Sequence, residues 1–142
     1  MTYFFFILHS TFISLWGVGI PYLQNRLELS NIYFGLLIAI LPLASIFGAW
    51  LSNYLNSPRV IFVTAGIYVS CISFLILSTN LYLIIIMLII TGLCSSHIII
   101  EANKMAVKLE KEGLNILGKC HSFYSISMVG SLAFGNILMI FL

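Results

Sequence analysis

Long apolar runs separated by short polar stretches are the dominant pattern of this 142-residue chain. The runs fall at about 3–23, 32–51, 60–79, 81–100 and 122–142. Each has roughly the 20 residues that an α-helix needs to cross the hydrocarbon core of a bilayer. Stretches such as LYLIIIMLII lack the alternation with period two that a membrane β-barrel requires. The pattern therefore predicts an all-α membrane protein, a single bundle of five transmembrane helices over residues 1–142.

The connections between the runs are short and polar. QNRLELSN follows the first run and SNYLNSPR follows the second, while Asn80 alone separates the third run from the fourth, which predicts a tight helical hairpin. Pro42 interrupts the second run, so that helix is expected to be kinked and packed against others. The first run lacks a basic start and an A-x-A cleavage pattern, and we interpret it as a retained span.

Composition agrees with a membrane location and also predicts how the chain is oriented in the membrane. The chain is 61% hydrophobic and only 7% charged, whereas soluble domains carry about 25% charged residues. The second and fourth connections hold Arg59, Lys104, Lys108, Lys111 and Lys119, and the first and third hold Arg26. Because basic loops stay in the cytoplasm, this bias predicts a multi-pass protein of the cell inner membrane with a cytoplasmic N-terminus. The net charge of +2 is too small to indicate binding of nucleic acid.

Small residues recur at helical spacing in several runs, which favours close packing of helices within the membrane. The series are Ser10, Ser14 and Gly17; Gly35 and Ala39; Gly66, Ser70 and Ser73; and Ser127, Ser131 and Gly135.

The main candidate for chemistry is a stripe of titratable residues on the fourth run. His97, Glu101, Lys104 and Lys108 follow steps of four, three and four, so they share one helix face. One interpretation is a salt-bridged helix end at the membrane surface, and the other is a role in transport or gating. His97 lies about one turn deeper than Glu101 and is the better functional candidate. His9 in the first run could contact a substrate or move a proton, and its shallow depth favours the other interpretation, a histidine that faces the bundle.

An enzyme is not expected from this sequence. Ser95, Ser96 and His97 are neighbours along a helix and point in different directions, and no acid is placed to orient the imidazole. His97 and Glu101 have the spacing of two metal ligands, but two ligands do not make a metal site. The three cysteines are odd in number and widely spaced. We expect neither a metal nor another cofactor.

Three stretches together resemble the N-terminal half of a major facilitator superfamily transporter, most closely the bacterial branch related to fucose permease. They are GIPYLQNRLELSNIYFGLL, AWLSNYLNSPRV and NKMAVKLEKEGLNILGKCHSFYSISMVGSLAFG. In the last, Asn103, Glu110, Gly113, His121 and Ser125 fall on recurrent positions of that branch. The second departs from the family's loop pattern, because Asn53 stands for the usual acid, Tyr54 for a base and Asn56 for a glycine, while Arg59 keeps the basic end. Tyr124 replaces a usual tryptophan.

The resemblance implies secondary active transport of a small polar solute, such as a sugar-like molecule, across the cytoplasmic membrane, coupled to a proton or another ion. It implies a cavity lined by Trp16, His97 and Asn103 and a cytoplasmic gate that involves Asn53, Arg59 and Glu101. Transporters of this family have two six-helix bundles, so the chain resembles an incomplete N-terminal half. We therefore expect a fragment of a longer protein that needs the missing half or another chain. The alternative is a small multi-spanning protein that acts as a structural or regulatory partner or as a homo-oligomer.

Overall fold

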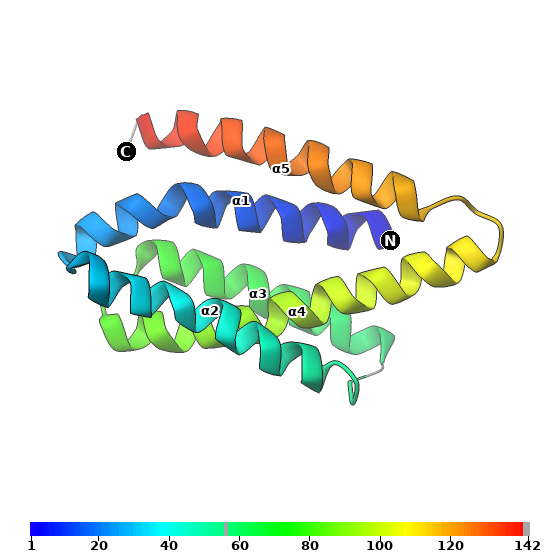
Figure 1. Cartoon of the computed structure of the whole chain (residues 1–142), viewed down its shortest axis with the longest axis horizontal. Helices are drawn as coiled ribbons and strands as arrows, with labels where there is room; N and C mark the ends of the chain where they lie inside the picture. The colour runs from blue at the N-terminus through cyan, green and yellow to red at the C-terminus, as the bar shows by residue number, and fades with distance from the viewer. Residues whose placement is uncertain (56, 141–142) are drawn as a thin grey trace. The chain divides into compact units, whose positions relative to one another are not determined.

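The computed structural model describes residues 1–55 and 57–140, and over these residues the chain is all α-helical (Figure 1). The helices are α1 (Thr2–Leu27), α2 (Asn31–Leu51), α3 (Pro58–Leu77), α4 (Leu81–Lys111) and α5 (Leu117–Ile140). Asn56 and the last two residues of the fifth predicted run lie outside the described residues. The prediction of five helices is confirmed within them. Of these, α1, α2 and α4 are long and apolar enough to cross a membrane, which indicates a multi-pass membrane protein. Crossing by α3 and α5 stays a prediction.

Two helices extend beyond their predicted ends. The stretch QNRLELSN was expected to be a turn, but α1 continues to Leu27 and α2 begins at Asn31. The turn is therefore confined to residues 28–30, where Glu28 adopts a positive φ of 51°. In the fourth run, the helix does not end near residue 100 but continues to Lys111, roughly 16 Å further at the α-helical rise. Much of the charged stretch is therefore helix rather than loop.

The chain divides into two compact units whose boundaries fall inside α1 and α4. Unit 1 comprises Met1–Ile20 and Glu101–Leu142, and unit 2 comprises Pro21–Ile100.

Unit 2 is built on a close crossing of α2 and α4. The buried residues of α2 follow steps of three and four, as expected for one helix face, and are Phe34, Leu37, Leu41, Ala44 and Gly48. A Cβ at Gly48 would lie 2.7 Å from the Leu93 Cα, and one at Gly92 would lie 2.7 Å from the Ala44 Cβ. Both glycines are therefore needed for the two backbones to approach. Ser96 adds a hydrogen bond from its hydroxyl to the Ser45 carbonyl, at 2.7 Å.

The prediction that Gly66, Ser70 and Ser73 mediate helix packing is wrong within this structure. All three are exposed on α3, and a Cβ at Gly66 would meet nothing within 4 Å. The buried face of α3 carries larger side chains instead, which are Ile61, Ala65, Tyr68, Cys71 and Leu75. Gly35 on α2 is likewise exposed, with open space around its Cα.

In unit 1, small residues do form the contact between α1 and α5. Ser14 donates its hydroxyl hydrogen toward the carbonyls of Ser10, at 2.9 Å, and Met128, at 3.1 Å. The hydroxyls of Thr11 and Ser127 lie 2.8 Å apart. A Cβ at Gly135 would lie only 3.3 Å from side-chain atoms of Leu15 and Val18. The predicted series on these two helices is thus confirmed in part, through Ser14, Ser127 and Gly135. Ser10 bonds only within α1, and Gly17 is exposed.

The α3–α4 connection is the tight hairpin that the sequence predicts, and Figure 1 shows the two helices antiparallel. The Asn80 side-chain oxygen accepts hydrogen bonds from the backbone N–H groups of Tyr82, at 3.0 Å, and Leu83, at 3.3 Å. The first backbone N–H groups of a helix have no acceptor inside that helix. Asn80 supplies one and so caps the N-terminus of α4.

Candidate functional site

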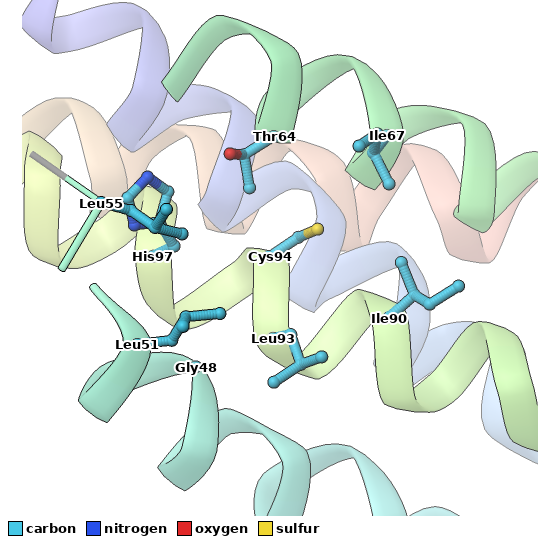
Figure 2. A pocket seen from close by; sticks show the side chains of 9 residues that line it. All are labelled: Gly48, Leu51, Leu55, Thr64, Ile67, Ile90, Leu93, Cys94 and His97. Atoms are coloured by element: carbon cyan, nitrogen blue, oxygen red, sulfur yellow. The ribbon is translucent and has the colours of Figure 1, made fainter. Parts of the chain in front are cut away.

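A cavity of about 230 Å³ lies in unit 2, where α2, α3 and α4 meet (Figure 2). Its lining residues are Gly48, Leu51, Leu55, Thr64, Ile67, Ile90, Leu93, Cys94 and His97. Five of these carry leucine or isoleucine side chains, so the walls are mostly apolar. The groups able to make polar contacts are the imidazole of His97, the hydroxyl of Thr64 and the thiol of Cys94.

The helical repeat of α4 explains how its residues reach one cavity. Ile90, Leu93, Cys94 and His97 are separated by three, one and three positions, which places them on one face of the helix. Figure 2 shows His97 near Leu51 and Leu55 at one end of the cavity and Thr64 facing α4 from α3. Gly48 contributes by the absence of a side chain, because it lets α2 come close to the backbone of Leu93.

His97 gives this cavity its chemical character. The residue is only 3% exposed and lies in a helix apolar enough to cross a membrane. Thr64 donates its hydroxyl hydrogen to the Val60 carbonyl at 2.6 Å, so this donor is already used within α3. An ionisable group in such a helix is costly to place and is a functional candidate by default. Both ring nitrogens of His97 are buried, so the arrangement could hold a proton, whereas a ligand in the cavity would meet mostly apolar side chains.

Of the six residues predicted for the site, only His97 lines this cavity. Trp16 on α1 and Asn103 on α4 are both half-buried and belong to unit 1. Asn53 is exposed in the turn after α2, and its backbone N–H donates to the Trp50 carbonyl at 3.2 Å. Arg59 is exposed in the first turn of α3. The roles assigned to these four residues stay predictions.

Glu101 forms the ion pair expected for the charged stripe of α4. Its carboxylate lies 2.6 Å from the Lys104 ammonium, one turn along the helix. The Glu101 side chain is 14% exposed and that of Lys104 is 44% exposed. The ion pair is therefore confirmed for these two residues, but it lies inside α4, which continues to Lys111, and not at a helix end. Its position relative to a membrane and a role in gating stay predictions.

Metal chemistry has no counterpart in the described structure. Among residues 1–55 and 57–140, no group of three or more histidine, cysteine or acidic side chains could hold a metal ion. His97 and Cys94 offer two such side chains on consecutive turns, which does not complete a coordination sphere.

An aromatic cluster in unit 1 was not predicted from the sequence. His9 is 8% exposed and stacks on Tyr124, with ring centroids 6.0 Å apart, and Phe6 meets the edge of His121 at 5.6 Å. Phe6 and His9 are three positions apart on α1, as His121 and Tyr124 are on α5. These matching intervals were the available signal, but they indicate a contact only once α1 and α5 are known to be neighbours.

Arg26 has a structural role that the sequence analysis also missed. Its guanidinium donates hydrogen bonds to the carbonyls of Leu75 and Ser78 at the end of α3. It also lies 5.5 Å from the centre of the Tyr22 ring. A positive charge at a helix C-terminus offsets the partial negative charge of the free carbonyls there. Arg26 therefore ties the end of α1 to the end of α3.

Comparisons with protein families, with curated proteins and with solved structures find no match to this chain.

Proposed function

We propose that this chain is part of a secondary active transporter that moves a small polar solute across the cytoplasmic membrane. The observation that carries the proposal concerns His97. This titratable side chain is buried on α4, a helix apolar enough to cross a membrane, and it lines a cavity. An imidazole can bind and release a proton, and ionisable side chains within membrane helices mark proton pathways. A proton is therefore the coupling ion that this site fits best, and sugars are the first class of solute to test.

The resemblance described above supports the same proposal. Alternating access in such transporters requires two bundles that move against each other around a central solute. We therefore propose that the chain works with a missing transporter half or with another chain. Within the proposed transporter, Trp16 and Asn103 would join His97 as cavity residues, and Asn53, Arg59 and Glu101 would belong to the cytoplasmic gate.

The proposal can be tested by uptake measurements on the protein encoded by the complete reading frame. The protein would be reconstituted in vesicles that contain a pH-sensitive dye, and single monosaccharides would be added outside. Solute-dependent acidification of the lumen is the expected result. His97→Gln removes the titratable group at similar size. We expect this variant to lower the rate of solute-dependent proton uptake at least tenfold.

His121→Gln provides the matched control, because His121 is exposed on α5 and lies outside the cavity lining. Its proton uptake should stay close to that of the unchanged protein. Equal activity of His97→Gln and the unchanged protein would exclude proton coupling through His97. A reading frame that ends at codon 142, together with a stable product that moves no solute, would favour the alternative of a structural or regulatory membrane protein.

A further inference from the structure

The part of α4 beyond residue 100 has two opposite faces. Lys104, Lys108 and Lys111 follow steps of four and three and are all exposed, so they occupy roughly 60° of the helix circumference. Ala102 and Ala106 are 0% exposed and lie on the other side of the helix. The small alanines pack within the protein, and the lysines point away from it.

The neighbouring carboxylates cancel this positive charge only in part. Glu101 is paired with Lys104. Glu110 accepts hydrogen bonds from the backbone N–H groups of Ile116, at 2.6 Å, and Leu117, at 2.9 Å, and so caps the start of α5. Within the described part of the chain, no ion pair is formed by Lys108, by Lys111 or by the exposed Lys119 of α5. Counted over the whole stretch, the four lysines Lys104, Lys108, Lys111 and Lys119 exceed the three carboxylates Glu101, Glu110 and Glu112 by one positive charge.

Apolar side chains are exposed beside these lysines. Val107 on α4 is 42% exposed and Leu114, just after the helix, is 51% exposed. They lie seven and 14 positions beyond Ile100, where the apolar part of α4 ends. Lysines mixed with apolar groups on the continuation of a membrane-crossing helix suit the headgroup region of an anionic bilayer when that continuation lies along the membrane surface.

We propose that Lys108, Lys111 and Lys119 bind the headgroups of anionic phospholipids, while Val107 and Leu114 contact the boundary between headgroups and acyl chains. The lysine ammonium groups supply three hydrogen-bond donors each for phosphate oxygens. The exposed apolar pair favours a lipid over an acidic protein segment or free phosphate, because only the lipid offers acyl carbon beside its charge. This surface belongs to unit 1 and shares no residue with the lining of the His97 cavity, which belongs to unit 2, so the proposal is independent of transport.

The test measures lipid binding to the full chain in a neutral detergent. Phosphatidylglycerol and phosphatidylcholine, each labelled on an acyl chain, are titrated against the protein, and fluorescence anisotropy gives the Kd of each. We expect tighter binding of phosphatidylglycerol, with about a fivefold loss of this preference for each lysine changed to glutamine. The triple variant K108Q/K111Q/K119Q should bind the two lipids almost equally. Addition of 0.5 M salt should weaken the preference of the unchanged protein.

The double variant E101Q/K104Q is the matched control, since it removes one charge of each sign from the same helix face. It should keep the preference for phosphatidylglycerol. Equal binding of both lipids by the unchanged protein, equal losses in the control and the triple variant, or displacement of the lipid by millimolar inorganic phosphate would overturn the proposal.

Glu112→Lys keeps the proposal testable if the triple variant does not fold, because it adds a positive charge at the same surface. Its affinity for phosphatidylglycerol should rise about fivefold or more. An unchanged affinity would contradict the proposal.

Discussion

Gly113 shows how a single residue shapes the end of the longest helix. It has φ of 82° directly after α4. The Leu114 N–H donates to the Leu109 carbonyl at 3.3 Å, and the Gly113 N–H donates to the Glu110 carbonyl at 3.0 Å. This pair of bonds is the Schellman arrangement, which satisfies carbonyls that the helix leaves free. The chain can therefore turn from α4 toward α5 without losing those hydrogen bonds.

Gly113→Ala should lower the free energy of unfolding by about 1 kcal/mol, because a side chain disfavours the left-handed conformation. Thermal unfolding in detergent, followed by circular dichroism, measures the change. Gly118→Ala is the matched control, since Gly118 lies in α5 with a Cβ position that meets nothing within 4 Å. Its melting temperature should be unchanged or higher. Equal melting temperatures for the two variants would contradict the role given to Gly113.

At the scale of helices, contact is decided by which small residues face a neighbouring backbone. Gly48 and Gly92 allow α2 and α4 to cross closely, whereas Gly66 on α3 faces open space. All three glycines lie in apolar runs, and their local sequences do not distinguish them. The difference arises from the direction in which each helix is rotated, which depends on the burial of larger neighbours such as Leu41 and Tyr68.

Gly48→Ala should destabilise the protein by about 1 to 3 kcal/mol, because its Cβ would overlap backbone atoms of Leu93 that cannot move independently. Gly66→Ala should be neutral or stabilise by up to about 1 kcal/mol, since alanine is the better helix former. Both changes can be measured from thermal unfolding of the purified variants. A similar loss of stability in the two variants would show that helix propensity, rather than the α2–α4 crossing, decides the outcome.

For the whole molecule, hydropathy was enough to predict the number and order of the helices, but it misplaced the ends of α1 and α4 and the start of α5, which is Leu117 and not residue 122. The end of α1 was missed because polar residues such as Gln24 can still be helical, here with the Gln24 amide donating to the Asn31 side chain at 2.6 Å. The extension of α4 was missed because hydropathy assigns a charged stretch to a connection between helices, even where its residues have helical spacing. The candidate site was predicted only for His97, since cavity lining requires knowledge of α2 and α3 beside it.

The predicted orientation of the whole chain can be tested with single cysteines in a background without native cysteine. Leu114→Cys lies in the exposed connection after α4, and Glu28→Cys lies in the exposed turn after α1. A membrane-impermeant maleimide added to intact cells should label the cysteine at 28 and not the one at 114. Inverted vesicles should give the opposite result. Labelling of residue 114 from outside would reverse the orientation.

Cys120 is a poorer reporter of orientation, although it precedes the fifth predicted span. It is 0% exposed, and burial, with a smaller contribution from the Glu110 carboxylate, raises the pKa of its thiol. Because the thiolate is the reactive form, maleimide should modify Cys120 slowly at pH 7 and faster as the pH rises toward the raised pKa. The rate for Leu114→Cys at pH 7 should be clearly higher in the same vesicles.

The sequence by itself determined that the chain is helical, that its helices follow in this order and that at least three of them are of membrane type, because these properties depend on local runs of apolar residues. Tertiary structure decided which glycines permit close crossings, that His97 shares a cavity with Thr64 and Cys94, and that Arg26 joins the end of α3. These features depend on how each helix is rotated against its neighbours. That rotation is set by the packing of residues far apart in the chain, and no local pattern records it.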